Sequence, residues 1–497
     1  MKSFQYSFGL VLFLLIFIGT ESVAQLTQDF DIVLIGGRVI DPETGLDAIK
    51  NVGIIGNRIA EITSHPLNAK EIINAKGLVV APGFIDMHVH GRTNVEQEYR
   101  LRDGTTTALE LESGIELLGL WYKSRESKSL INYGASVSWP FERFKAQAMY
   151  AKTFQRLYQL RLNGELTRDT VFAAIAPSYL NQLTSEEINM TLENVEKSLS
   201  EGGIGIGVPI GYLPEASAEE VFRIYQLAGV LQAPIFTHVR SGGIMAIQQT
   251  ISDAVLTNAP LQVVHINSMA GRDVLLAIEM VNTARKLGYD ISAEIYPYTA
   301  GSTRINSAIF DEGWQERMGL DYKDLQWVPT GERLTKESFD LHRTESEYVI
   351  IHAMKEEWIR AGIIAPGVMI ASDGSPYYPN AHPRGAGTFA KVLGRYVREE
   401  KLLSLSSAIE KMTLLPAKRL ESISPMMRFK GRIQIGADAD ITIFNPETII
   451  DKATFEKGLA FSEGVEYIIV NGTIVLKHGR VVENTFPGQG VYGKYKK

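Results

Sequence analysis

The stretch Ala81–Gly91 reads APGFIDMHVHG, an apolar run that ends in two histidines, His88 and His90, with one residue between them. Because the side chains of a strand alternate between its two faces, a strand here would point both imidazoles in the same direction. Two imidazoles at this spacing are typical of ligands for a zinc-type ion. The alternative is a pair of half-exposed histidines at a strand end, so the metal hypothesis needs further ligands from elsewhere in the chain.

The composition limits the kind of protein and the kind of chemistry. The chain has 497 residues, of which 45% are hydrophobic, enough for a large domain with a smaller companion. A formal charge of −7 without a long basic run argues against a nucleic-acid partner. The sequence contains no cysteine, so disulfides and thiolate chemistry are excluded and any metal must be held by nitrogen and oxygen ligands.

The N-terminus predicts export. One lysine precedes an apolar core at residues 8–18, and the small residues Ser22 and Ala24 follow it, which is typical of a signal peptide at residues 1–24. The apolar core is shorter than the roughly 20 residues that a membrane-spanning helix needs. We therefore expect a periplasmic or secreted protein with no stable membrane span after cleavage; an uncleaved anchor is the alternative.

The two ends of the chain have the same kind of sequence pattern. Residues 25–80 and 430–484 are short β-type runs separated by Gly, Asn and Asp-Pro turns. We expect the two segments to form one small β-sandwich domain, followed by a C-terminal tail at residues 485–497.

The middle of the chain, residues 81–429, alternates short apolar runs with helix-like segments such as residues 345–361, as in repeated βαβ units. Eight such repeats favour a (β/α)₈ barrel, in which the working residues lie at the C-terminal ends of the strands. The eight candidate strands are Phe84–Val89, Thr105–Glu112, Ala135–Trp139, Gly203–Ile210, Pro234–Val239, Leu261–Ile266, Ile291–Tyr296 and Val368–Ser372.

Three ligand-competent residues fall at the ends of these strands. They are His238 after the fifth strand, His265 after the sixth and Asp373 after the eighth. A barrel would bring them together with the two histidines of the first strand, so the sequence predicts a metal site there.

The second strand adds two carboxylates, Glu110 and Glu112, on one face. A carboxylate inside an apolar strand is costly to bury without a charge partner, which a metal would provide. Glu112 is nearer the C-terminal end of the strand, so we prefer it as a ligand that bridges two ions. Glu110 is the candidate for an ion pair with an arginine inside the barrel.

These residues, in this order, resemble the amidohydrolase superfamily and, within it, the N-acyl-D-amino-acid deacylase (D-aminoacylase) branch. The superfamily motif corresponds to Pro82–His90, His238, His265 and Asp373. Similarity to the branch is carried by Gly211–Pro214, Thr237–Arg240, Tyr296–Thr303 and His382–Phe389, and Gly436–Ile441 resembles the small β domain of many superfamily members.

The resemblance implies metal-assisted hydrolysis of a carbon–nitrogen bond with one or two zinc ions. His238 and His265 would hold the tighter ion, His88, His90 and Asp373 would face a second position, and Glu112 would touch both. A bound zinc ion lowers the pKa of its water to about 7, which supplies hydroxide at neutral pH. Asp373 would take the proton from that water and deliver it to the leaving amine.

Two departures from the branch bear on the site. The branch often has a cysteine ligand after the second strand, where this chain reads Glu112-Ser113-Gly114, which favours Glu112 as the bridge. A lysine that branch members tend to carry after the sixth-strand histidine is replaced by Asn267, which leaves the substrate open. The fourth strand contains no lysine, which argues against a carboxylated-lysine bridge.

An N-acyl amino acid also requires a partner for its carboxylate, and arginine provides two parallel hydrogen bonds. The candidates are Arg384 and Arg240, with Tyr212, Tyr298 and Ser302 as further donors. Each has a structural alternative; Arg240, for example, could pair with Glu110. We expect His352 to be a supporting or packing residue.

Three functional hypotheses follow. The first is an N-acyl-D-amino-acid deacylase that acts on a small-molecule amide. The second is a cyclic-amide hydrolase or dipeptidase of the same superfamily, because one metal site can attack many carbon–nitrogen bonds. The third, from a different class, is a non-catalytic binding protein that has kept the barrel.

Overall fold

The computed structural model describes residues 1, 30–375 and 379–497. Apart from Met1, the predicted signal peptide at residues 1–24 lies outside the described residues. Within the described part of the chain, none of the helices combines the length and apolar character needed to cross a bilayer.

Eight parallel strands form the central sheet, as the sequence predicts. In hydrogen-bonding order they are β16 (Val368–Ile370), β12 (Ile291–Ile295), β11 (Leu261–Val263), β10 (Ile235–His238), β9 (Ile206–Pro209), β8 (Asn132–Ser138), β7 (Thr105–Ile115) and β6 (Phe84–Asp86). A parallel bridge between Val89 and Gly374 joins the segments that follow the first and last strands. The sheet is therefore a nearly closed barrel, and each strand overlaps one of the eight predicted runs.

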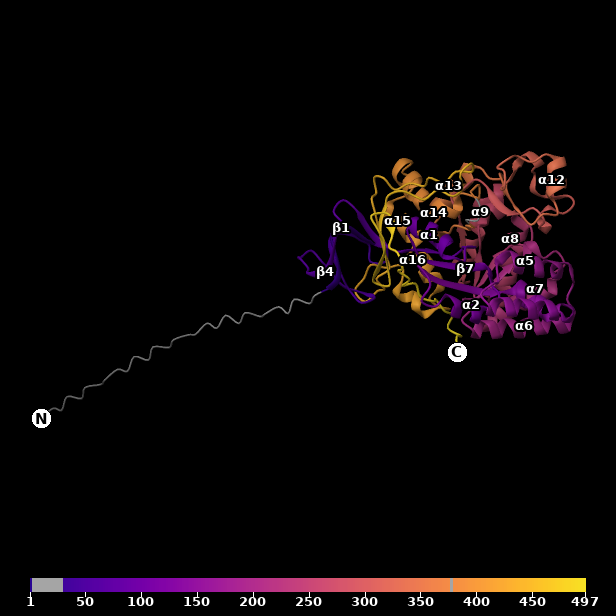
Figure 1. The fold of residues 1–497 in the computed structure, drawn as a ribbon, viewed down its shortest axis with the longest axis horizontal. Coiled ribbons are helices and arrows are strands. Elements are labelled where there is room, and N and C mark those ends of the chain that lie inside the picture. Colours follow the sequence, from indigo (N-terminus) through magenta and orange to yellow (C-terminus); the bar gives the residue numbers. More distant parts are fainter. Residues whose placement is uncertain (2–29, 376–378) are drawn as a thin grey trace.

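Helices surround this barrel (Figure 1). They are α1 (Asn94–Arg102), α2 (Leu118–Arg125), α3 (Trp139–Ala146), α4 (Ala151–Leu162), α5 (Arg168–Ile175), α6 (Ser185–Ser200), α7 (Ala218–Leu231), α8 (Ile244–Thr257), α9 (Ile266–Ala270), α10 (Val274–Lys286), α13 (Glu356–Ile364), α14 (Arg384–Lys391), α15 (Leu405–Met412) and α16 (Leu414–Leu420).

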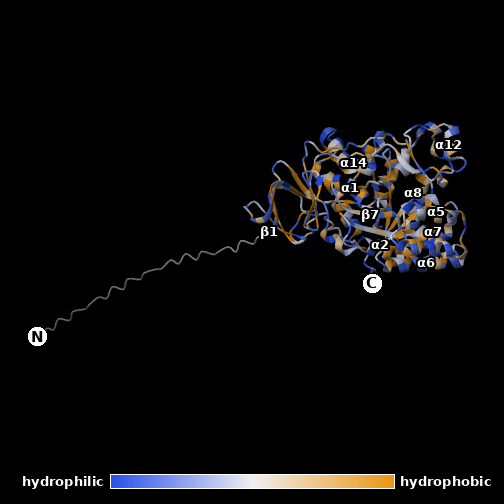
Figure 2. Ribbon diagram, viewed as in Figure 1, coloured by the Kyte–Doolittle hydropathy of each residue, from blue (hydrophilic) through white to orange (hydrophobic). Residues whose placement is uncertain are grey.

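Helix α6 illustrates why these segments are helical. Thr184 caps its N-terminus, and its side chain accepts from the backbone N–H of Glu187 while the Glu187 carboxylate accepts from the cap, which satisfies donors that the first turn leaves unpaired. Ile188, Val195 and Leu199 form the buried stripe of the helix. The outer helices α6 and α7 accordingly show mixed orange and blue in Figure 2.

Both chain ends contribute to a second sheet. Hydrogen bonds join nine strands into it: β1 (Phe30–Asp41), β2 (Leu46–Ile55), β3 (Arg58–Thr63), β4 (Ala69–Asn74), β5 (Val79–Pro82), β17 (Ile441–Phe444), β18 (Val465–Val470), β19 (Thr473–Lys477) and β20 (Arg480–Val481). The central contact is between β5 and β17, where Ala81 pairs with Thr442. Leu34, Val52, Ile443 and Ile469 belong to its apolar core. The sheet thus fixes the chain directly before β6.

An insertion between β12 and β16 was not predicted. It contains a three-stranded sheet of β13 (Gly301–Arg304), β15 (Tyr348–Ile351) and β14 (Leu325–Trp327), with helices α11 (Trp314–Met318) and α12 (Lys336–His342). Its own core includes Phe310, Trp314 and Phe339. The predicted helix over residues 345–361 is wrong in its first half, because β15 pairs with β13 and β14 and the helix α13 begins only at Glu356.

The C-terminal tail lies against the N-terminal end of β8. The backbone N–H of Val491 donates to the Tyr133 carbonyl at 2.7 Å, and the Tyr122 hydroxyl donates to the Val491 carbonyl at 2.7 Å. Val491 is buried. The tail therefore covers the end of the barrel opposite to the strand ends that carry the predicted ligands.

Candidate active site

Glu112, on β7, contacts four histidines with its two carboxylate oxygens. Its Oε2 lies 3.4 Å from His88 Nε2 and 3.3 Å from His90 Nε2. Its Oε1 lies 3.1 Å from both His238 Nδ1 and His265 Nε2. The carboxylate thus divides the histidines into two pairs, one on each oxygen, which is the geometry of a bridge between two ion positions.

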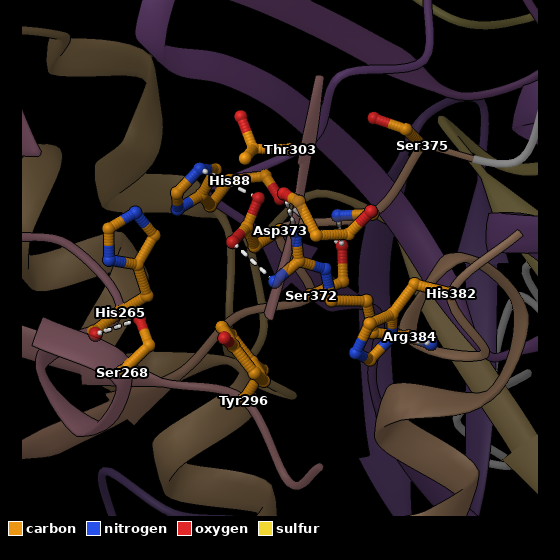
Figure 3. A network of polar contacts seen from close by, with 12 residues as sticks. His88, His265, Ser268, Tyr296, Thr303, Ser372, Asp373, Ser375, His382 and Arg384 are labelled. Carbon is orange, nitrogen blue, oxygen red and sulfur yellow. Dashed lines mark hydrogen bonds and ion pairs between the residues drawn. The ribbon is translucent and has the colours of Figure 1, made fainter. Parts of the chain in front are cut away.

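Asp373 completes the first of these positions. Its Oδ1 lies 3.2 Å from His90 Nε2 and 3.4 Å from His88 Nε2, and its Oδ2 lies 2.7 Å from Arg384 Nη1. Figure 3 shows the carboxylate between the His88 ring and the Arg384 guanidinium, with the Tyr296 ring below them in this view. The aspartate therefore contacts both the histidine cluster and the arginine.

Two residues of the cluster have a backbone conformation that residues other than glycine seldom adopt. His265 has φ of 34° and Asp373 has φ of 53°, both in the left-handed region. The strain at Asp373 is held by the first strand, since the Asp373 N–H donates to the His88 carbonyl at 2.7 Å and the His90 N–H donates to the Gly374 carbonyl at 3.0 Å. Such conformations persist where the surrounding structure determines them, and they cluster at functional sites.

The first two histidines are oriented by carboxylates behind them. His88 Nδ1 lies 2.6 Å from Glu294 Oε1, and His90 Nδ1 lies 3.0 Å from Glu110 Oε1. These contacts direct both Nε2 atoms at Asp373 and Glu112, an arrangement typical of metal-ligating histidines. Glu110, the candidate for an ion pair with an arginine, contacts the His90 imidazole, and the charges of His90, Arg92 and Arg168 lower its pKa against the effect of burial. Glu294 was missed, although it too is a carboxylate inside an apolar strand.

The donor set fits divalent metal ions. All the converging atoms are nitrogen or oxygen, and they form overlapping groups of three within 4.8 Å: His88 with His265 and Asp373, His88 with His90 and Glu112, and Glu112 with His238 and His265. Among the described residues, His88 Nε2 is buried without a hydrogen-bond partner, although two carboxylate oxygens lie 3.4 Å away. A nitrogen lone pair that faces carboxylates in this way is suited to a shared cation.

The electrostatics agree with this fit. Burial disfavours charge on His90, but the Glu110 carboxylate and Asp373 together raise its pKa to about 10. Burial opposes ionisation of Glu112, yet the four surrounding histidines hold its pKa well below the usual range. Burial likewise opposes charge on Asp373, and Arg384 and His88 outweigh it and lower the pKa. The surroundings therefore keep both carboxylates ionised, the form in which a carboxylate can be a metal ligand.

A cavity of about 1060 Å³ opens over these residues. Of the predicted substrate-binding residues, Tyr212, Arg240, Ser302 and Arg384 line it, together with Tyr296. Tyr298 does not fit its predicted role, because its hydroxyl faces Asp451 Oδ2 at 3.4 Å and its ring lies under Lys391. Tyr296, two residues earlier, lines the cavity wall instead. Both tyrosines belong to one local sequence motif, and only the packing of the turn decides which of them faces the cavity.

Arg384 is held from several sides. Its guanidinium stacks on the Tyr296 ring at 4.6 Å, and Nη2 donates to the Ser302 carbonyl at 3.4 Å. Its backbone N–H donates to His382 Nδ1 at 3.1 Å, and His382 Nε2 donates to the Ala300 carbonyl at 2.8 Å. The arginine is 5% exposed, so it is positioned before any ligand arrives.

The other lining residues have local partners. Arg240 Nη1 donates to the Ala216 carbonyl at 2.9 Å, so its alternative pairing with Glu110 is wrong. The Tyr212 ring lies 4.7 Å from the His238 ring, and the Ser302 hydroxyl donates to the Val349 carbonyl at 3.0 Å. His352 contacts Gln326 at 2.9 Å in the inserted sheet, which agrees with a packing role.

Known proteins match the chain over nearly its whole length. The family model described as "Amidohydrolase family" matches residues 71–159 and 254–476. A D-aminoacylase of Alcaligenes xylosoxydans xylosoxydans is 30% identical over 496 residues, which is 93% of this chain and 97% of the relative. An N-acyl-D-glutamate deacylase of the same organism is 28% identical, covering 90% of this chain and 94% of the relative.

The fold also has a close counterpart among solved structures. The N-acyl-D-glutamate deacylase of Bordetella bronchiseptica, determined with zinc and a phosphonate inhibitor that mimics the tetrahedral intermediate of its reaction, has a TM-score of 0.77 at 23% identity. The match covers 94% of this chain and 100% of that chain. With the barrel, the histidine and carboxylate cluster and these matches in agreement, this chain belongs to the amidohydrolase family.

Proposed function

We propose that this protein is a metal-dependent hydrolase of N-acyl-D-amino acids that releases a carboxylate and a D-amino acid. The observation that carries the proposal is the contact between Asp373 and Arg384 at 2.7 Å. An arginine, which can bind a carboxylate through two parallel hydrogen bonds, therefore lies directly beside the acid that faces the histidines, and this supports an N-acyl amino acid as the substrate. The D-aminoacylase and N-acyl-D-glutamate deacylase among the relatives support this substrate class.

The residues that would hold metal follow from the cluster. His88, His90, Asp373 and one Glu112 oxygen form one position, and His238, His265 and the other Glu112 oxygen form the second. When bound there, a zinc-type ion acts as a Lewis acid that polarises a carbonyl and acidifies water.

Asp373 is suited to move a proton. Its pKa is held low by Arg384 and His88 against the effect of burial, so it is a carboxylate at neutral pH and can accept. Its two oxygens face opposite sides, one toward the histidines and one toward Arg384. A proton taken at the histidine side can then be delivered to the nitrogen of a substrate whose carboxylate lies at Arg384.

Arg384 has capacity for a ligand carboxylate. Among the described residues, its Nε is buried without a hydrogen-bond partner, and a buried unpaired donor is costly until something accepts from it. Two parallel N–H groups of a guanidinium match a carboxylate. Tyr212 also lines the cavity, and because its hydroxyl accepts from Thr303 at 3.3 Å, its own O–H can donate to a ligand.

The wall near Arg384 favours a neutral amino-acid side chain. Met269, Ile351 and Met354 line the cavity, and Met354 is next to this wall, since its sulfur lies 3.5 Å from the Asn267 amide that contacts Tyr296. Asn267 is buried, and its amide donates to the Tyr296 carbonyl at 3.1 Å, so it orients the tyrosine. We therefore propose D-leucine- or D-methionine-like substrates in preference to D-glutamate or D-aspartate.

The test is a substrate panel on the protein loaded with zinc. N-acetyl-D-amino acids should release amine, N-acetyl-L-amino acids should not, and Asp373→Asn should abolish turnover while metal content stays measurable. Hydantoin and dihydropyrimidine form the cyclic-amide arm of the panel. Release from L-substrates alone, or faster turnover of the cyclic amides, would contradict the proposal; a protein without bound metal would favour the binding-protein hypothesis.

We also propose that the chain is exported, because residues 1–24 have the pattern of a signal peptide. N-terminal sequencing of the protein from a native host should begin at Gln25. A mature protein that still starts at Met1 and fractionates with the cytosol would refute export.

A further inference from the structure

The cavity extends well beyond the histidine cluster into an apolar region. Its apolar side chains come from α5, from the segments next to it and from the ends of β8 and β9. We call this region the acyl arm; it is lined by Pro140, Val171, Phe172, Ile175, Tyr179 and Leu213. These side chains offer a ligand apolar contacts but few hydrogen-bond partners.

The acyl arm lies across the barrel from Arg384. In the hydrogen-bonding order of the eight strands, β8 and β9 are the sixth and fifth, whereas β16 and β12 are the first and second. In a nearly closed ring of eight these two pairs face each other. Tyr296 follows β12 and Arg384 follows β16, so the part of the acyl arm formed by Pro140 after β8 and Leu213 after β9 starts on the side of the barrel opposite to the carboxylate-binding side. Helix α5 reaches back over the mouth of the barrel, where Arg304 stacks on Phe172.

We propose that the acyl arm binds a large apolar acyl group, so that long-chain or aromatic N-acyl-D-amino acids are hydrolysed in preference to N-acetyl compounds. This inference rests on the proposed function. With the carboxylate at Arg384 and the scissile amide beside Asp373 and Glu112, the acyl group has to extend toward the opposite side. A cavity of about 1060 Å³ is at the upper end of the roughly 300–1,000 Å³ typical of sites for drug-sized ligands.

The polar groups at the edge of the acyl arm have partners within the protein. Glu116 accepts from Arg92 at 2.9 Å and also from Arg161. Arg168 Nη1 donates to Ser375 Oγ at 3.2 Å. An apolar acyl group can lie beside these groups without leaving a buried charge unpaired. The α-ammonium group of a dipeptide would have to be desolvated there, and the carboxylate that it would meet, Glu116, is already neutralised by two arginines.

Helix α5 is held over the cavity by the insertion. Arg304, on β13, stacks on the Phe172 ring at 4.6 Å and forms an ion pair with Asp169. The arm is therefore bounded by elements that pack against each other, which favours a defined site over an open groove.

The first test needs no variant. N-acetyl-, N-butanoyl-, N-hexanoyl- and N-octanoyl-D-leucine are compared by kcat/KM, together with L-leucyl-D-leucine. Because each buried methylene contributes to binding, we expect kcat/KM to rise about threefold for each of the first added methylenes. The octanoyl substrate should have a kcat/KM at least about 30-fold higher than the acetyl substrate. Equal rates across the series, or a preference for the dipeptide, would overturn the inference.

A second test uses a filled arm. Val171→Trp should lower the ratio of octanoyl to acetyl turnover by about tenfold, because the larger side chain occupies the arm. Ala173→Trp, on the exposed side of the same helix, is the matched control and should keep the ratio. An unchanged ratio in a folded Val171→Trp protein would contradict the assignment of the arm.

Binding separates this inference from the proposed function. Calorimetry with the Asp373→Asn protein should give a Kd for N-octanoyl-D-leucine at least about 30-fold lower than for N-acetyl-D-leucine. If this difference is found and no D-substrate is hydrolysed, the proposed function fails while the apolar site stands. If the two ligands bind equally, the inference fails whatever the activity.

Discussion

Arg384 Nη1 lies 2.7 Å from Asp373 Oδ2, while the other oxygen of that carboxylate lies 3.2 Å from His90 Nε2. One aspartate thus links the group proposed to bind the substrate carboxylate with the cluster proposed to hold metal. In the proposed mechanism, a ligand carboxylate bound at the guanidinium would also act on the acid that moves the proton. Substrate binding and proton transfer would then be coupled through a single side chain.

Replacing Asp373 by asparagine should remove most of the activity without unfolding the protein. The amide keeps the size of the side chain but cannot accept the proton, and general acid–base groups contribute about 10²–10⁴-fold. We expect kcat to fall by about 10³-fold, measured by amine release, and Tm to fall by a few degrees because the buried Arg384 loses its anionic partner. Asp47→Asn, in an exposed pair with Arg38 on the nine-stranded sheet, is the control; a loss of activity there would point to a general effect of the substitution.

Glu112→Gln should reduce the metal content. A neutral amide does not bridge two cations as a carboxylate does, so we expect about one ion fewer per chain by elemental analysis. Glu112→Cys restores an anionic ligand and should recover part of that loss. If both variants bind as much metal as the original chain, Glu112 is not the bridge.

The carboxylates behind the histidines should matter less than the ligands. Glu294 and Glu110 orient His88 and His90 through Nδ1, and loss of such partners typically costs 10–100-fold in metal affinity. Glu294→Gln and Glu110→Gln should therefore shift chelator titrations by about that factor and leave saturated stoichiometry intact. A complete loss of one ion in either variant would instead make that glutamate a ligand.

Arg384→Lys should separate substrates by their carboxylate. A lysine cannot make two parallel hydrogen bonds, nor can it stack on Tyr296 as the guanidinium does. We expect KM to rise by about 10–100-fold for N-acyl-D-leucine and to change little for the matching primary amide, which has no carboxylate. Equal effects on both substrates would show that the arginine acts only through Asp373.

Gly374→Ala should destabilise the protein. A Cβ at this position would lie 1.8 Å from Arg100 Nη2, and Arg100 is fixed because its Nη1 donates to the Arg384 carbonyl at 3.1 Å. Overpacking of this kind costs about 1–3 kcal/mol, so Tm should fall by a few degrees. Gly242→Ala, whose Cβ would meet its nearest neighbour at 3.7 Å, should show no such loss.

His352 should contribute to acid sensitivity. Burial, with Arg333 nearby, lowers its pKa to about 4 in the folded protein, below the ordinary value of 6.5. As pH falls through that window, the unfolded chain takes up a proton that the folded chain does not, so stability falls between about pH 6.5 and 4. Denaturant titrations across this range should show a smaller loss in His352→Gln, and identical losses would mean that other groups account for the sensitivity.

Much of the barrel could be predicted because its features are local. Each strand is a short apolar run next to a helical pattern, and all eight runs lie on observed strands. The insertion was missed because β13, β14 and β15 are short, and β15 is stable only by pairing with strands that lie 20 or more residues before it.

The sequence by itself determined which residues could be ligands. His88, His90, Glu112, His238, His265 and Asp373 stand at the ends of parallel strands, and the geometry of a barrel requires such ends to converge. The tertiary structure decided the pairings. The partner of His88 is Glu294, 206 positions away, and Glu110 contacts His90. Tyr296 lines the cavity wall, where Tyr298 was expected. These contacts join side chains from different strands, and no local pattern encodes the distance between them.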